Sequence, residues 1–349
     1  LSEGIELAKK LESFGVDALH VDVGCYEVWN KAINTVYDEA PTQIHIAKEI
    51  KKNVNIPVLA QGKLSDPELA EEIIKNGDAD FIGLGHQSVA DPNWVNKLRR
   101  NETYDIIPCI GCNECLLAYF SGQNTHCAVN PLTFNEDYYQ LEPTNTEKRV
   151  LVIGGGPGGM AAAITAAQRG MKVELWEKTN NLGGLLLAAG APNFKKDVAK
   201  YVDYLIGKVY RSGVSLKMLK NATIDNVLAE RFDKVILATG SHPIIPPIPG
   251  VKDNPNVLLA PDVMKGKEKF GKDVVVIGGG LVGCECAAYC AETADRVTII
   301  EMCDDILTTV VHAANNDMAL RCMLAERKIE MICGATVSEI KEHEVNYTK

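Results

Sequence analysis

Four cysteines in one short stretch have the spacing that most directly suggests chemistry. Cys109, Cys112 and Cys115 follow one another with two residues between each pair, and Cys127 comes after eleven more. Three thiolates on one loop and a fourth from the next segment favour a [4Fe–4S] cluster, because structural zinc sites usually take two separated pairs of ligands. A zinc site and unliganded thiols are the two alternatives for these cysteines.

Two glycine-rich turns each follow a hydrophobic stretch and precede a helical one. Their glycines are Gly154, Gly156 and Gly159 in the first turn, and Gly278, Gly280 and Gly283 in the second. The first glycine allows the tight bend, the second lets a pyrophosphate approach, and the third lets helix and strand pack. In each copy an acid, Glu177 or Glu301, lies 23 residues after the first glycine, where it suits the ribose hydroxyls. These two complete units predict two dinucleotide sites.

The elements that must position these residues follow from the chain's pattern. The first hundred residues alternate expected strands and helices, with strands at 16–24, 56–62 and 79–85, and helices at 42–54, 66–77 and 91–100. Asp66 is a suitable N-cap, with Pro67 in the first position of its helix. Such βα repeats predict a TIM barrel or a doubly wound sheet. A polar linker at 141–149 precedes the first nucleotide turn.

Composition and charge exclude several classes of function. The 349 residues are 46% hydrophobic and 23% charged, as in soluble globular proteins. A net charge of −10 without a basic run argues against a nucleic acid partner. We see neither a membrane-spanning apolar run nor a signal peptide, and the clustered cysteines favour a reducing, cytoplasmic setting. The chain begins at Leu1 inside a helical pattern and stops at Lys349, so we expect a piece of a longer polypeptide.

The segments around the first turn resemble the FAD domain of two-dinucleotide flavoprotein reductases. The matching glycines and threonine are Gly183 and Gly184 after the first acid, and Thr239 and Gly240 at the end of a later strand. In that family the second fold is inserted into the first and binds the nicotinamide nucleotide. The resemblance therefore implies FAD at 154–177 and NAD(P)H at 278–301. Glu301 and the acidic residues after it favour NADH over NADPH.

The order of elements resembles the iron–sulfur flavoenzymes of the Old Yellow Enzyme superfamily, which include 2,4-dienoyl-CoA reductases, enoate reductases and trimethylamine dehydrogenase. The resemblance implies an α/β chain with the C-terminal part of a TIM barrel, an iron–sulfur segment and two nested, truncated Rossmann-like domains. The expected limits are 1–105 for the barrel part, 106–147 for the iron–sulfur segment and linker, 148–265 for the FAD domain and 266–349 for the NAD(P)H domain.

The resemblance also implies FMN at the mouth of the barrel. In the family, the loops after the last two strands hold its phosphate, and they match Gly62-Lys63 and Gly85-His86 here. Relatives commonly carry arginine at both basic positions. Lysine supplies a point charge without arginine's fork, and the alternative for His86 is a surface histidine after a glycine turn.

Tyr26 is the one catalytic candidate. It lies in a Gly-Cys-Tyr segment typical of enoate-reductase-like members, where it would point over the flavin and donate a hydrogen bond or a proton to the substrate. The alternative is a tyrosine packed at the barrel rim. The cysteine spacing instead matches the amine-dehydrogenase branch, because dienoyl-CoA reductases usually have three residues in the second gap.

Together these implications predict an NADH-dependent oxidoreductase. Electrons would pass from NADH through FAD, the cluster and FMN to an activated carbon–carbon double bond in an unsaturated acid, thioester or ketone. The alternatives are an amine or steroid dehydrogenase that runs the same route oxidatively, and an NADH diaphorase that serves a protein partner. The sequence leaves the oligomeric state open, a homo-oligomer included.

Overall fold

The computed structural model describes residues 1–139, 141–309 and 311–349. The chain divides into two compact units, which are considered separately here. The first contains Leu1–Asn135 and His312–Ala319, and the second contains Glu136–Val311 and Leu320–Lys349. This division is coarser than the four expected domains, whose limits stay predictions.

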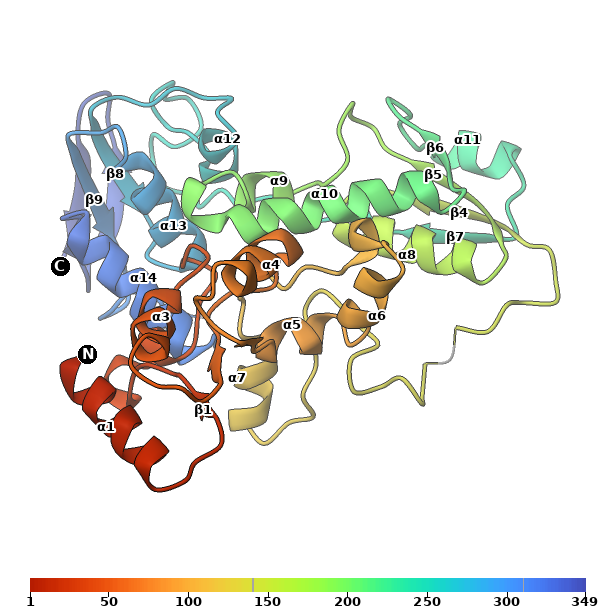
Figure 1. Ribbon diagram of the computed structural model, residues 1–349. Helices are drawn as coiled ribbons and strands as arrows, with labels where there is room; N and C mark the ends of the chain where they lie inside the picture. Colours follow the sequence, from red (N-terminus) through yellow and green to blue (C-terminus); the bar gives the residue numbers. More distant parts are fainter. Residues whose placement is uncertain (140, 310) are drawn as a thin grey trace. The chain divides into compact units, whose positions relative to one another are not determined.

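A small parallel sheet with helices between its strands organises the first unit (Figure 1). Its strands lie in the order β1 (Leu19–His20), β2 (Val58–Ala60) and β3 (Phe81–Ile82). The helices before and between them are α1 (Ser2–Ser13), α3 (Ile44–Lys51) and α4 (Pro67–Lys75). Val58 and Ala60 are fully buried in the hydrophobic core that these elements share. The expected βα alternation is confirmed, with shorter strands than the sequence pattern suggested.

The remaining elements of the first unit are short. They are η1 (Tyr26–Val28), α2 (Trp29–Ala32), α5 (Gly85–Ala90), α6 (Trp94–Arg99), η2 (Thr103–Asp105) and α7 (Glu114–Phe120). The helix expected at 91–100 begins only at Trp94, so that prediction was wrong at its start. Asp91 Oδ1 accepts a hydrogen bond from the Asn93 N–H and holds a turn there, while its Oδ2 accepts from Lys97 and the Ile107 N–H, so the helix begins only after this turn.

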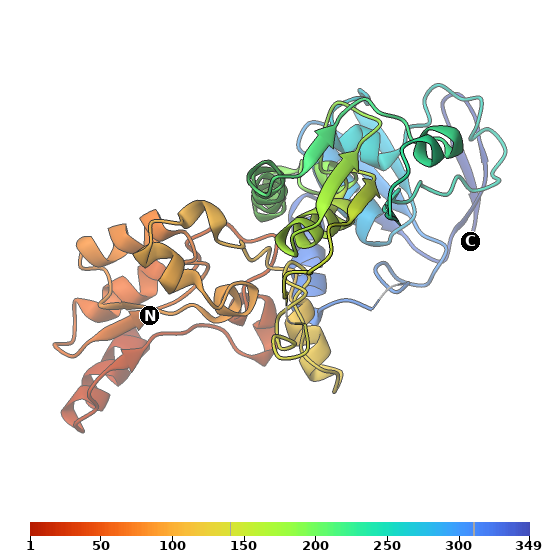
Figure 2. The ribbon, with the colours of Figure 1, turned by 90° about the vertical axis from the view of Figure 1, so that its right-hand side faces the viewer.

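Two parallel sheets organise the second unit, which Figure 2 shows from a second side. The first sheet has the order β6 (Ser215–Lys217), β5 (Lys172–Trp176), β4 (Arg149–Ile153) and β7 (Lys234–Leu237). The second has the order β10 (Glu330–Ile332), β9 (Arg296–Ile300) and β8 (Asp273–Ile277). In each sheet the strand before the glycine turn, β4 or β8, is followed towards one edge by the next two strands in chain order, β5 and β6 or β9 and β10. This is the strand order of a nucleotide-binding half.

Helices follow both glycine turns. α8 (Pro157–Gln168) follows the first turn and packs against α10 (Lys196–Arg211), the long helix in Figure 1, while α13 (Leu281–Cys290) follows the second. The other elements are α9 (Leu186–Ala189), η3 (Asn193–Lys195), α11 (Ile224–Ala229), α12 (Ala260–Met264), β11 (Thr336–Ile340) and β12 (Val345–Thr348). Helix α14 (Ala314–Glu326) begins in the first unit, which contains its residues up to Ala319. No helix of the described residues is long and apolar enough to cross a membrane.

Burial explains why β4 reads as an unbroken hydrophobic stretch. β4 pairs with β5 on one side and β7 on the other, and Val150, Leu151 and Val152 are each at most 2% exposed. A strand inside a parallel sheet that is covered on both faces needs apolar side chains at every position. The structure is therefore of the mixed α/β class that the sequence predicted.

Asp66 caps α4 as its sequence predicted, since its carboxylate accepts hydrogen bonds from the N–H groups of Glu68 and Leu69. Replacing Asp66 with alanine should weaken α4 by about 1 kcal/mol, because both groups lose their acceptor. Hydrogen exchange of the α4 amides measures this local opening free energy. The control Glu71→Ala removes only an exposed ion pair to Lys75 and should have a much smaller effect. Equal effects would contradict the capping role.

Candidate nucleotide, flavin and cysteine sites

In each nucleotide turn a close backbone contact requires glycine at the first and third positions of the fingerprint. Gly154 and Gly278 have φ angles of +110° and +102°. A Cβ on Gly159 would lie 1.8 Å from the Gly154 carbonyl oxygen, and one on Gly283 would lie 1.9 Å from that of Gly278. No side chain fits there, so helix and turn meet as the spacing suggested.

The middle glycines of the fingerprints face open space. Gly156 and Gly280 stand just before α8 and α13. Among the described residues, no atom lies within 4 Å of a Cβ placed on Gly156, and the nearest to one on Gly280 is Thr309 Oγ1 at 3.6 Å. Neither glycine places a side chain at the start of its helix, where a pyrophosphate must approach the backbone closely.

A glycine that the sequence analysis did not single out holds each acid. Glu177 Oε2 accepts a hydrogen bond from the Gly155 N–H at 2.8 Å, and its Oε1 accepts one from Thr179 at 2.7 Å. Glu301 repeats this with the N–H groups of Gly279 and Cys303. The run of three consecutive glycines in each turn was the signal for this contact. Each carboxylate oxygen keeps a second lone pair for a further donor.

These hydrogen bonds decide the charge of the acids. Burial alone would raise the pKa of the Glu177 carboxyl, but the N–H groups of Gly155 and Thr179 outweigh it and hold the pKa below its usual value. The same balance lowers the pKa of Glu301, where the donors are Cys303 and Gly279. Both carboxylates are therefore charged at neutral pH.

Two further segments enclose the first turn. The Gly183 N–H donates to the Gly155 carbonyl at 2.9 Å, and a Cβ on Gly184 would lie 3.1 Å from Gly156 Cα. On the other side, a Cβ on Gly154 would lie 2.2 Å from the carbonyl oxygen of Ala238 and 3.4 Å from Thr239 Cα.

Gly240, which has a φ of +73°, ends the segment on that second side. In the second turn, the Leu307 N–H donates to the Gly279 carbonyl at 2.8 Å and so takes the position of Gly183. No atom of the described residues lies within 4 Å of a Cβ on Gly278. The first turn is therefore in contact with other segments on two sides.

The cysteine segment lies in the first unit, and its four thiols are half-buried and outside any disulfide. The Gly111 N–H donates to Cys109 Sγ at 3.4 Å. Burial raises the pKa of Cys109 to about 12 and that of Cys112 to about 11, and charge repulsion from the other thiolates of the segment adds to both. The pKa of Cys115 is raised for the same reasons, with Cys127 as the main charged neighbour.

Across the part of the chain that the structure describes, no three His, Cys, Asp or Glu side chains converge closely enough to hold one metal ion. The four cysteines therefore influence one another electrostatically without forming a single-ion site. The cluster expected from their spacing stays a prediction.

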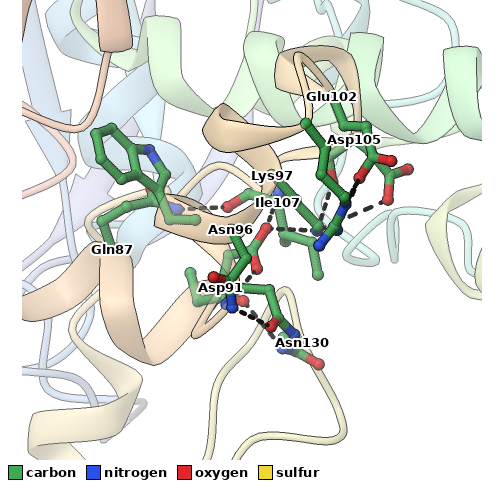
Figure 3. A network of polar contacts seen from close by, with 12 residues as sticks. Gln87, Asp91, Asn96, Lys97, Glu102, Asp105, Ile107 and Asn130 are labelled. Carbon is green, nitrogen blue, oxygen red and sulfur yellow. Dashed lines mark hydrogen bonds and ion pairs between the residues drawn. The ribbon is translucent and has the colours of Figure 1, made fainter.

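Helix α5 holds the backbone on both sides of the cysteine segment (Figure 3). The Gln87 side chain accepts a hydrogen bond from the Cys109 N–H at 3.1 Å and donates one to the Ile107 carbonyl at 2.8 Å. After the segment, Asn130 Nδ2 donates to the Ala90 carbonyl at 2.9 Å. The sequence offered no sign of these contacts, because the partners lie at least 20 residues apart.

A buried ion pair completes this network. Asp91 Oδ2 lies 2.6 Å from Lys97 Nζ and accepts a hydrogen bond from the Ile107 N–H at 2.9 Å. Lys97 also donates to the carbonyl of Asp105 at 2.7 Å (Figure 3). Before Cys109, side chains thus hold the carbonyl of Asp105 and both the N–H and the carbonyl of Ile107.

The residues expected at the FMN phosphate lie near one another, and the lysine already has partners. Lys63 Nζ donates to the carbonyl of Thr35 at 2.8 Å and to that of Asp38. His86 follows Gly85 at the start of α5 and is half-buried, so it is no surface histidine. Burial lowers the pKa of His86, the charge of Lys63 lowers it further, and an interaction with Asn113 opposes them.

Gly62 also needs to be a glycine. Its φ is +112°, and a Cβ there would lie 2.4 Å from Thr42 Oγ1. The Thr42 N–H in turn donates to the Gly62 carbonyl at 3.1 Å. The loop that carries Lys63 is therefore fixed against the segment before α3.

Tyr26 is 80% exposed, so it does not pack at the barrel rim in this structure. Its ring lies 4.9 Å from that of Trp29, and Trp29 lies 5.5 Å from Phe120 in an edge-on contact. Phe120 ends α7, the helix that carries Cys115. The catalytic role of Tyr26 stays a prediction.

Comparisons with known proteins agree with this two-part organisation. Residues 148–349 match the family described as pyridine nucleotide-disulphide oxidoreductase, and residues 2–104 match the NADH:flavin oxidoreductase / NADH oxidase family. An NADH oxidase from Thermoanaerobacter brockii is 43% identical over 91% of this chain and 50% of its own length. A cinnamate reductase from Clostridium sporogenes is 36% identical over 97% of this chain and 51% of its own.

Among solved structures, a 2-naphthoyl-CoA reductase in complex with 2-naphthoyl-CoA superposes with a TM-score of 0.92 at 30% identity, over 99% of this chain and 53% of that one. The chain thus spans about half the length of the curated relatives it matches. The TIM-barrel and Rossmann-type assignments made from the sequence are confirmed by these matches.

The hydrogen bonds that Glu177 accepts from Gly155 and Thr179 should make a pH-dependent contribution to the free energy of unfolding. Because the folded-state pKa is lowered, the contribution is present above about pH 4.5 and disappears as the pH falls through the lowered value. Glu177→Gln should unfold about 2 kcal/mol more easily at pH 7, since an amide NH₂ then faces a backbone N–H. Chemical unfolding at several pH values measures how this difference shrinks in acid. The exposed Glu147→Gln serves as control, and a pH-independent difference would contradict the assignment.

Proposed function

Because the chain belongs to the NADH:flavin oxidoreductase / NADH oxidase family through residues 2–104, and to the pyridine nucleotide-disulphide oxidoreductases through residues 148–349, we propose an activity for the whole protein. It is a cytoplasmic, NADH-dependent iron–sulfur flavoprotein reductase. It transfers electrons from NADH through FAD, a [4Fe–4S] cluster and FMN to an activated carbon–carbon double bond. A flavin exchanges electrons singly or in pairs, which lets it serve on either side of a one-electron cluster.

The observation that carries this proposal is the contact between Gln87 and Cys109. Gln87 directly follows His86, a residue expected at the FMN phosphate, and its side chain binds the backbone of the first cysteine. One short helix, α5, thereby supports both the expected flavin loop and the cysteine segment. An electron route needs its centres held at a fixed separation, and a shared helix provides that.

The donor set of the cysteine segment fits a cluster better than a zinc ion. A structural zinc site requires four ligands that converge on one point at about 2.3 Å from the metal, for sulfur ligands. In a [4Fe–4S] cluster each cysteine binds a different iron atom, so the sulfurs stay apart. Three cysteines on one loop and a fourth eleven residues further on suit the second case, because each can reach a different corner of the cluster. Cys109, Cys112, Cys115 and Cys127 would hold the cluster.

The two nucleotide turns suit different ligands. The first packs against Gly183 and Ala238, in the segments that resemble those of FAD domains, so we assign FAD to it and NADH to the second. In the second turn the charged Glu301 is followed by Asp304 and Asp305, which would repel the 2′-phosphate of NADPH. We therefore propose NADH as the electron donor.

The relatives suggest the substrate class. The names of the cinnamate reductase and the 2-naphthoyl-CoA reductase point to a conjugated acid and a conjugated thioester. We propose a small unsaturated acid, thioester or ketone for this protein. The equal spacing of the first three cysteines favours, as a second candidate, the oxidation of an amine, and a dimethylglycine/sarcosine dehydrogenase is 31% identical over 75% of the chain.

The test uses the whole protein under anaerobic conditions. We expect about four iron atoms and four sulfides per chain, and flavin and iron–sulfur absorption bands that NADH bleaches and cinnamate restores. An NADPH titration should bleach them far more slowly. Flavin without iron, or zinc in place of iron, would refute the relay. Bleaching by dimethylglycine instead of NADH would favour the amine reading, and dye reduction without cinnamate reduction would favour a diaphorase.

Tyr26 provides a test of the catalytic step. If its hydroxyl donates a proton to the reduced substrate, Tyr26→Phe should lower kcat for the double bond by roughly 10²- to 10⁴-fold. Reduction of a dye by NADH should be unchanged, because that reaction does not need the hydroxyl. Steady-state kinetics measure both rates, with Tyr119→Phe, another exposed tyrosine of the same unit, as control. Equal losses in both reactions would contradict a role in proton donation.

A further inference from the structure

Two buried asparagines from distant parts of the sequence meet at the cysteine loop. Asn113 lies between Cys112 and Cys115, and Asn316 lies in the first turn of α14. Asn113 Nδ2 donates to Asn316 Oδ1 at 2.7 Å. The two residues are 2% and 8% exposed, and both belong to the first unit. They lie 203 positions apart, so the sequence gives no hint of this pair.

Asn316 also binds the backbone of the loop itself. Its Nδ2 donates to the carbonyl of Gly111 at 3.3 Å and to that of Cys112 at 3.2 Å. All of its side-chain hydrogen-bonding groups are therefore engaged with three consecutive loop residues. A buried amide that satisfies two backbone carbonyls and one side chain fixes the planes of the peptides it touches.

The loop needs these hydrogen bonds because its backbone has an unusual, left-handed conformation. Gly111 and Asn113 have φ angles of +65° and +60°, so two left-handed residues frame Cys112. Gly111 is also pressed against Thr35, since a Cβ on it would lie 2.9 Å from the Thr35 carbonyl. In this conformation the Gly111 N–H points at Cys109 Sγ, 3.4 Å away. Any rotation of the peptides around Gly111 would redirect that donor.

We propose that Asn316 is a positioning residue for the cysteine loop. By holding the carbonyls of Gly111 and Cys112, it fixes the two peptides that flank Cys112. The Gly111 N–H lies in the preceding peptide, whose orientation relative to this fixed pair depends on the φ and ψ of Gly111, so Asn316 helps to keep that N–H directed at Cys109 Sγ and tunes the reduction potential of the cluster. Hydrogen bonds to the sulfurs are among the factors that set such potentials, because they stabilise the more negative, reduced state. This inference rests on the proposed function, which supplies the cluster.

The test compares three variants of the whole protein. Asn316→Asp keeps an acceptor for Asn113 but replaces the donor to the two carbonyls, and Asn316→Ala removes the side chain. The matched control is Asn315→Ala, because Asn315 is a buried asparagine in the same turn whose Nδ2 donates to the Ile33 carbonyl at 3.2 Å and does not bind the loop. Iron, sulfide and FAD contents are measured first, followed by a redox titration monitored by electron paramagnetic resonance.

We expect both Asn316 variants to shift the cluster's midpoint potential downward and to change its resonance signal, while Asn315→Ala stays at the wild-type value. Loss of iron from the Asn316 variants with FAD retained would also support positioning. Wild-type potential and signal in both variants would overturn the inference. Loss of FAD and of the folded state together with the cluster would mark Asn316 as merely structural and overturn it too. A wild-type protein without iron and sulfide would refute the proposed function itself.

Discussion

The structure around the cysteines depends on one requirement, that backbone polar groups without a helix or strand partner must find side chains. Between Ile106 and Asn135 the chain forms one short helix and no strand. Buried amides and a carboxylate replace the missing ladder, with Gln87 and Asp91 before the cysteines, and Asn316 at the loop. These side chains satisfy backbone groups that a sheet neighbour would otherwise bind.

The second unit applies one local solution twice. In both nucleotide turns the N–H of Gly155 or Gly279 binds the acid at the end of the next strand, and a buried aliphatic residue, Leu182 or Ile306, packs beside that glycine. The acid is therefore part of the turn's own structure and not a free side chain awaiting a ligand. Its charge is set by the fold before any nucleotide binds.

Part of the structure could be predicted from the sequence because it depends on interactions between residues that are close in the chain. The glycine turns, the acids and the Asp66 cap depend on neighbours within about one βα unit, so their spacing carries the information. Gln87, Asn113 and Asn316 were missed because their partners lie 20 to 205 residues away, and an asparagine or glutamine has no spacing rule. The helix predicted from Asp91 starts three residues later, at Trp94, because Asp91 Oδ1 holds a turn at Asn93 while its Oδ2 binds Lys97 and the distant Ile107 N–H.

The close packing of the first turn has a consequence for the cost of binding. The Ala238 carbonyl and the Gly183–Gly184 bend press on the first turn from two sides, so its backbone is held in place before any ligand arrives. A nucleotide bound there would not have to order the turn, and the entropy lost on binding would be correspondingly small.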